Sequence, residues 1–100
     1  MSSEQIPVRP GQVWADNDPR VTGRTIRIDA VDGDVATCTV LTNDAESQAK
    51  IDTHGSPGKS GRYMGGTWVP GDRRGTTTRV KLARLRPVAS GYRLLEDTDA

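Results

Sequence analysis

The sequence of 100 residues contains no Phe, a single Cys and a single His. One cysteine cannot form an internal disulfide, and Cys38 together with His54 cannot supply the ligand set of a structural zinc site. No apolar run is long enough to cross a membrane as a helix, and the first residues, M-S-S-E-Q, lack the features of a signal peptide. We therefore expect a cytoplasmic protein with no membrane association, no metal and no other cofactor.

Side chains that could support catalysis are equally scarce. The only histidine, His54, lies in the loop T-H-G-S-P-G-K-S-G (53–61), which resembles no catalytic turn. Its G-K-S ending is shared with phosphate-binding loops, but the upstream glycine that such loops need falls on Thr53. Two D-x-D pairs, at 16–18 and 32–34, lie in separate turns, where Asp side chains bond to nearby backbone. We expect a protein that is not an enzyme.

What the sequence does contain is a repeated alternation of apolar and polar residues, which is typical of strands with one buried face. R-T-I-R-I-D-A-V (24–31) and V-A-T-C-T-V-L (35–41) both alternate in this way, and the Asp32-Gly33 pair between them favours a tight hairpin. Further strands are expected at 12–15, 76–83 and 92–96. The expected core is formed by apolar residues, namely Val13, Trp14, Ile26, Ile28, Val31, Val35, Cys38, Val40, Val80, Leu82, Leu85, Tyr92 and Leu94.

The order of these elements predicts a fold class. One tight helical turn, A-R-L-R-P (83–87), precedes the last strand. Five strands with such a turn are typical of an SH3-like barrel, and a five-stranded OB-like barrel is the alternative. We therefore predict one all-β domain over 11–96, with a flexible N-terminal arm at 1–10 and an acidic tail at 97–100.

The strand pattern is interrupted between the third and fourth strands. Residues 42–75 hold seven of the eleven glycines, and so long a connection in a small domain indicates either function or disorder. D-A-E-S-Q-A-K-I (44–51) predicts a short helical turn capped by Asp44. R-Y-M-G-G-T-W-V (62–69) predicts a small hairpin within the insertion.

Charge is distributed unevenly along the chain. The formal net charge is +1, but residues 1–50 carry −3 and residues 51–100 carry +4. Between Lys59 and Arg93, nine basic residues accompany a single acid, Asp72. Such a stretch suits an acidic partner or nucleic acid. The candidate contact residues for such a partner are Arg62, Arg73, Arg74, Arg79, Lys81, Arg84 and Arg86.

Three aromatic residues are candidates for recognition. Tyr63 and Trp68 lie in the basic insertion, where their rings could stack on bases while arginines contact phosphate. The alternative is that both rings fold back onto the barrel and the arginines only solvate the surface. Trp14 is the third candidate, because Val13 fits the core register better and leaves Trp14 partly covered by the 16–23 loop or the arm.

Two resemblances accompany this interpretation. The first consists of G-Q-V (11–13), a second glycine before R-T-I-R-I (24–28), and D-G-D (32–34) before V-A-T-C-T-V (35–40). This pattern resembles a KOW-type unit, the small SH3-like element of ribosomal proteins and transcription elongation factors. The resemblance implies an SH3-like fold over 11–40.

The second resemblance is carried by the blocks P-G-Q-V-W-A-D-N-D (10–18), G-R-T-I-R-I (23–28), T-R-V-K-L-A-R-L-R-P (78–87) and G-Y-R-L (91–94). Together they resemble short uncharacterised proteins encoded by actinobacterial phages and their hosts. The resemblance implies a phage-type accessory protein in a host cytoplasm. We expect such a module to bind a host or phage protein, or to self-associate; the alternative is a nucleic-acid-binding SH3-like module that uses residues 59–93.

Overall fold

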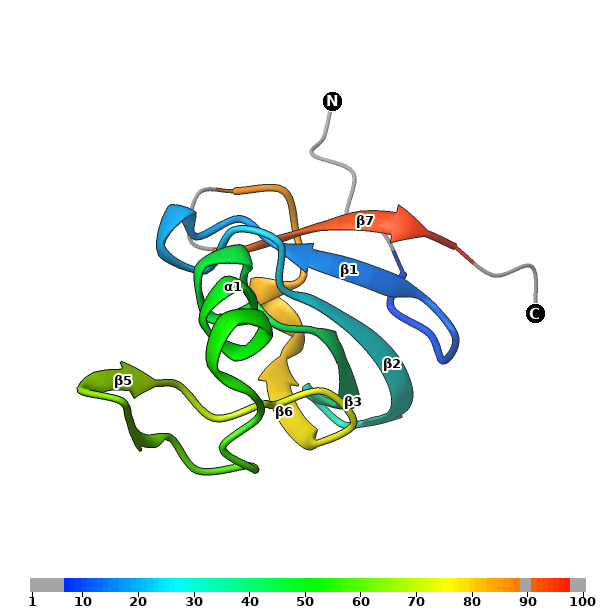
Figure 1. The fold of residues 1–100 in the computed structure, drawn as a ribbon. Helices are drawn as coiled ribbons and strands as arrows, with labels where there is room; N and C mark the ends of the chain where they lie inside the picture. Colours follow the sequence, from blue (N-terminus) through cyan, green and yellow to red (C-terminus); the bar gives the residue numbers. More distant parts are fainter. Residues whose placement is uncertain (1–6, 89–90, 98–100) are drawn as a thin grey trace.

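A computed structural model describes residues 7–88 and 91–97. Its main feature is a five-stranded antiparallel sheet with the order β6-β3-β2-β1-β7 (Figure 1). The sheet strands are β1 (Val13–Asp16), β2 (Thr25–Asp32), β3 (Val35–Thr42), β6 (Thr77–Lys81) and β7 (Tyr92–Glu96). The remaining elements are the helix α1 (Ala45–His54), the hairpin strands β4 (Arg62–Met64) and β5 (Thr67–Val69), and the 3-10 helices η1 (Pro19–Val21) and η2 (Leu82–Arg84).

The predicted barrel is not closed. Strands β6 and β7 form the two edges of the sheet, and no ladder joins them in the part of the chain that the structure describes. The connection between them places Leu85 fully inside the core, so that side-chain packing covers this side where strand pairing would close a barrel. Residues 7–88 and 91–97 are mostly β, with one α-helix of ten residues, and not all-β. Over these residues neither the SH3-like nor the OB-like closed form is present.

The alternation of the central hairpin correctly predicted most of the core. The buried cluster is made of Trp14, Ile26, Ile28, Ala36, Cys38, Val40, Val80, Leu85 and Tyr92, with Leu82 and Leu94 packed against it. Cys38 is buried as expected, and burial raises the pKa of its thiol to about 11. This side chain therefore serves the core as a small apolar group.

Three predicted core residues were misplaced. Val31 is 37% exposed where the β2–β3 pair ends in its turn, and Val35 is only half-buried because it belongs to the outward-facing set of β3. The register shift between Ile28 and Ala30 does not expose Val31: the extra residue moves Ala30 off the core face, while Val31 pairs with the buried Ala36. On β1 the prediction was reversed, since Val13 is half-buried and Trp14 is fully buried.

Trp14 is held in the core by a buried glutamine. Gln12 Oε1 accepts hydrogen bonds from the indole Nε1–H of Trp14 and from the backbone N–H of Arg9, both at 3.1 Å. Gln12 Nε2 donates to Pro7 O and to Asp97 Oδ1, both at 2.8 Å. Arg9 also pairs with Asp97 at 3.1 Å. This burial removes Trp14 from the candidate recognition residues.

The same contacts locate the ends of the described chain. Of the predicted flexible arm, residues 1–6 lie outside the described residues, while Pro7 and Arg9 are hydrogen-bonded to Gln12. Of the predicted acidic tail, residues 98–100 lie outside them as well, and Asp97 lies beside Arg9. The N-terminal and C-terminal segments thus meet at the N-terminal end of β1.

Replacing Gln12 tests whether this network stabilises the core. The Gln12→Met variant keeps the volume but leaves the indole N–H of Trp14 without an acceptor. We expect the free energy of unfolding to fall by about 1–3 kcal/mol, because a buried donor would lose its partner. Urea denaturation followed by circular dichroism measures the change. The control is the same substitution in a Trp14→Phe background, where the penalty shrinks because no indole N–H remains; an equal penalty in both backgrounds contradicts the role given to this bond.

Candidate functional site

The insertion between β3 and β6 is an ordered unit with its own small apolar cluster. Helix α1 begins after Asp44, whose carboxylate caps it by accepting the N–H of Ser47 at 3.0 Å. It runs beyond the predicted 44–51 turn and ends at Gly55, where φ is 91°. Ile51 on α1 and Val69 on β5 are both buried and lie outside the core cluster of the sheet. The helix and the hairpin therefore pack on each other.

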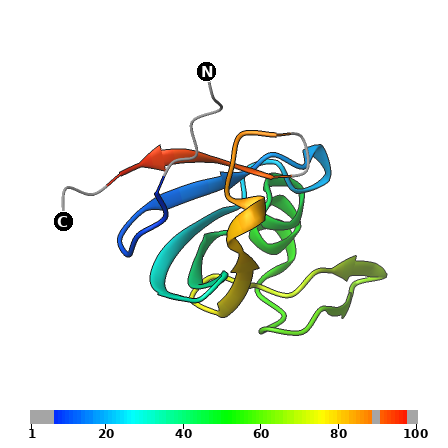
Figure 2. The same ribbon diagram turned by 180° about the vertical axis from the view of Figure 1, so that it is seen from behind.

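The β4–β5 hairpin lies at the place where the sequence predicted one, and it projects away from the main sheet (Figures 1 and 2). Tyr63 and Trp68 face each other across its two strands, with ring centroids 5.2 Å apart and an interplanar angle of 66°. Tyr63 is 74% exposed and Trp68 is 47% exposed. The two rings therefore do not fold back onto the sheet.

Trp68 has a structural contact that Tyr63 lacks. A Cβ atom on Gly61 would come within 2.5 Å of Cζ2 of Trp68, so the indole lies directly over this glycine. Any side chain at position 61 would displace the ring. Trp68 consequently combines a packed face with an exposed one, and Tyr63 is the more accessible member of the pair.

The base of the insertion, which we call the neck (Asn43, Gly58 and 72–73), is closed by polar contacts. The buried Asn43 donates through Nδ2 to Gln48 Oε1 at 2.7 Å and to Asp72 Oδ1 at 3.1 Å. Its Oδ1 accepts the backbone N–H of Arg73 at 2.9 Å. Asp72 N in turn donates to Gly58 O at 2.8 Å. One amide side chain thus joins the start of α1 to the returning chain.

Asp72 is further held by an ion pair with Arg74. Arg74 donates Nε to Oδ1 at 2.9 Å and Nη2 to Oδ2 at 2.6 Å. These bonds, together with the one from Asn43, hold the pKa of Asp72 well below its usual range. The single acid of the basic segment is therefore a structural partner, and Arg74 is already engaged by it.

The structure distributes the other candidate basic residues over separate elements. Arg62 lies on β4, Arg73 lies at the neck, and Arg79 and Lys81 are exposed on the edge strand β6. Arg86 is exposed beyond η2. The basic residues of this segment therefore do not form one continuous strip on a single element.

Arg84 also has a contact within the protein, with a core residue. Its guanidinium carbon lies 5.2 Å from the centroid of the Tyr92 ring, as a cation–π contact. Tyr92 is buried, which raises the pKa of its phenol. Arg84 thus covers a core residue, as well as belonging to the basic segment.

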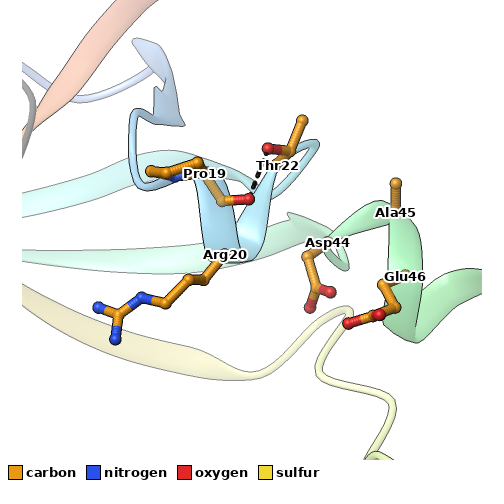
Figure 3. Close-up of a pocket in the computed structure, with 6 residues that line it drawn as sticks. All are labelled: Pro19, Arg20, Thr22, Asp44, Ala45 and Glu46. Atoms are coloured by element: carbon orange, nitrogen blue, oxygen red, sulfur yellow. Dashed lines mark hydrogen bonds between the residues drawn. The ribbon is translucent and has the colours of Figure 1, made fainter.

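A cavity of about 300 Å³ lies between η1 and the start of α1 (Figure 3). Asp44 and Glu46 line its helical side, while Thr22 donates its hydroxyl to Pro19 O at 3.0 Å. Arg20, on the opposite side, is paired with Asp18 at 2.7 Å and lowers the pKa of that carboxyl to about 2. Within 7–88 and 91–97, no group of three or more His, Cys, Asp or Glu side chains could hold a metal ion.

Asn43 and Arg24 are two site residues that the sequence analysis did not select. Asn43 precedes the recognised cap Asp44, but its contacts lie 29 and 30 residues further along the chain. Arg24 lies in the second strand region and lines a second cavity together with Arg73. No local pattern indicates contacts of such long range.

Comparison with protein-family models, with curated proteins and with solved structures found no match. The KOW-type and phage-protein resemblances therefore stay predictions. No helix in the described ranges 7–88 and 91–97 is both long and apolar enough for a membrane crossing.

The stability of the neck should depend on acid pH. The pKa of Asp72 is lowered in the folded protein, so its contribution is present above the unfolded value of about 3.9 and is lost as the pH falls below it. We expect amide hydrogen-exchange protection in 44–75 to drop between pH 5 and pH 2.5, while protection in β2 and β3 is retained longer. Asp72→Asn should remove this pH step.

Two further variants make the test specific to the neck. Asp32→Asn, in the β2–β3 turn, is the matched control and should keep the pH step. Asn43→Ala should lower the opening free energy of the insertion by about 1–3 kcal/mol at neutral pH, because the buried Arg73 N–H contact is lost. A pH step that persists in Asp72→Asn, or unchanged protection in Asn43→Ala, contradicts this account of the neck.

Proposed function

We propose that this protein is a non-enzymatic module that binds another protein through the β4–β5 hairpin. The observation that carries the proposal is the exposed pair Tyr63 and Trp68 on a projecting element. Tyr and Trp are enriched among the residues that dominate interface energetics. Adjacent exposed aromatic rings are unfavourable in water unless a partner covers them.

The neck supports the proposal because it presents the hairpin in one arrangement. Asn43 and Asp72 fix both ends of the insertion, and α1 packs against β5. A preorganised binding element loses less conformational entropy when it meets its partner. Within the described residues β4 and β5 pair only with each other, so each also offers a free backbone edge to an incoming strand.

We further propose that the main sheet is an SH3-like unit. Strands β1, β2, β3 and β6 pair with one another in the order of the sequence. The last strand, β7, pairs with β1, and the 3-10 helix η2 directly precedes β7 among the elements. This order and the KOW-like pattern of 11–40 both support the relationship. The hairpin is then an addition to that unit between its third and fourth sheet strands.

The class of partner follows from the second resemblance. The blocks at 10–18, 23–28, 78–87 and 91–94 favour a phage-type accessory protein that acts in a host cytoplasm on a host or phage protein. A second copy of this chain is the other protein partner to consider. Sedimentation of the isolated protein over a range of concentrations distinguishes self-association from binding to a different protein.

A photo-crosslinking residue at position 63 tests the proposal directly. We expect it to form a discrete covalent adduct with one protein of the host or phage, and unlabelled wild-type protein should compete. Tyr63→Thr keeps a residue of high β propensity at this position. It should weaken binding of that protein at least tenfold, because the contact between the Tyr63 ring and the partner is lost. Arg86→Ala, on the other side of the neck, is the control and should bind normally. An adduct for which wild-type protein does not compete, together with normal binding by Tyr63→Thr, would exclude the hairpin as the binding element.

Nucleic-acid binding is the second candidate function, and Arg62 on the aromatic hairpin favours it. Arg79 and Lys81 would add phosphate contacts from β6. Labelled single-stranded DNA, RNA and duplex DNA should then bind at low salt, with affinity falling steeply as salt rises. Arg79→Ala should reduce the salt slope by about one unit, and Tyr63→Thr should weaken single-strand binding by about 1–3 kcal/mol. Absence of binding at low salt removes this candidate and leaves the protein-binding proposal intact.

A further inference from the structure

A second, smaller cavity brings together two arginines that are far apart in the sequence. It has a volume of about 160 Å³ and is lined by Arg24, Val40, Asn43, Asp44 and Arg73. Arg24 precedes β2, and Arg73 belongs to the neck on the returning side of the insertion. The cavity therefore lies where the sheet, the start of α1 and the neck meet.

Arg24 has an unsatisfied donor at this cavity. Its Nε is buried and lacks a hydrogen-bond partner, and it is the one buried side-chain nitrogen or oxygen in the described part of the chain for which this holds. A buried N–H without an acceptor costs about 1–3 kcal/mol, so such atoms are uncommon in folded proteins. A bound acceptor group would remove this cost.

Arg73 supplies a second cation whose backbone is already fixed. Its N–H donates to Asn43 Oδ1 at 2.9 Å, while its carbonyl accepts from Thr76 N at 3.0 Å and from the Thr76 hydroxyl at 2.6 Å. The side chain has no acidic partner among the described residues. Both arginines thus line one cavity without an internal counter-ion.

Asp44 and Asp72, the acids at and next to this cavity, already have hydrogen-bond partners. Asp44 also lines it, but its Oδ2 accepts the N–H of Ser47 as the cap of α1. The neighbouring Asp72 is bonded through both oxygens to Arg74. The positive end of the helix dipole offsets part of the Asp44 charge. An incoming anion would consequently meet two arginines and one capped carboxylate.

We propose that this cavity binds a phosphoryl-type oxyanion between Arg24 and Arg73. The guanidinium group donates in a planar fork that matches the oxygens of phosphate, and charge-assisted bonds of this kind are the stronger ones. The volume is room for roughly five water-sized groups, which is the heavy-atom count of one phosphate. The site takes a phosphoryl group either as free phosphate or as the end of a larger phosphomonoester, and it is independent of the proposed function of the hairpin.

Titration of the wild-type protein with inorganic phosphate at constant ionic strength tests the proposal. The NMR signal of the Arg24 side-chain Nε–H reports directly on the buried donor. We expect this signal to shift along a saturating single-site curve, and sulfate should compete. Phenyl phosphate is the second arm: binding equal to that of phosphate indicates a site open to attached phosphoryl groups, and much weaker binding indicates a site for the free ion.

Variants distinguish a built site from general attraction to positive charge. Arg73→Gln keeps the backbone contacts of the neck and should weaken phosphate binding at least tenfold, and Arg24→Gln should do the same if it folds. Arg79→Gln and Arg86→Gln remove equal charge elsewhere and should leave the affinity unchanged, as should Tyr63→Thr. A non-saturating shift, or equal weakening by the Arg73 and Arg86 variants, overturns the proposal while leaving the test of the hairpin unaffected.

Discussion

The fold depends most on the burial of Trp14 and on the hydrogen bond that offsets the cost of burying its indole N–H. The chain has no Phe and only four aromatic residues, so one indole fills much of the centre of a thin core. Its N–H needs an acceptor there, and Gln12 Oε1 provides it at 3.1 Å. Gln12 uses its remaining bonding capacity on Arg9, Pro7 and Asp97, which joins both ends of the described chain to β1. The position of β1 and the anchoring of both ends of the described chain therefore depend on one hydrogen-bond network.

Asn43 repeats this device at the insertion. A second buried amide, again with its donors and acceptor engaged, connects segments about thirty residues apart in the sequence. A glycine-rich insertion alone would be expected to be loose, because glycine loses the most conformational freedom on folding. The neck and the packing of α1 against β5 offset that loss, so the exposed aromatic pair is carried on a defined support and not on a free loop.

Local sequence patterns were sufficient to predict the strands. They were not sufficient to predict features that depend on contacts between residues far apart in the sequence. Period-two alternation located β2, β3 and β6, and the aromatic residues around Gly65-Gly66 located the hairpin. The alternation could not reveal the register shift after Ile28, which takes Ala30 off the core face, because a bulge leaves no apolar signature. Trp14 was assigned to the wrong face because its partner, Gln12, looks like a surface residue in sequence. The open sheet depends on whether two edge strands meet, which no local pattern determines.

The basic segment shows the same limit for the candidate site. Counting charge along 59–93 treats all nine cations as available, yet Arg74 is bonded to Asp72 and Arg84 lies over Tyr92. Arg24 and Arg73, which have no acidic partner among the described residues, instead line the same cavity. They are far apart in the sequence, so their proximity is visible only in the structure. Because Asn43 holds the backbone of Arg73 and also closes the neck, an anion bound between the two arginines would favour the closed neck by linkage.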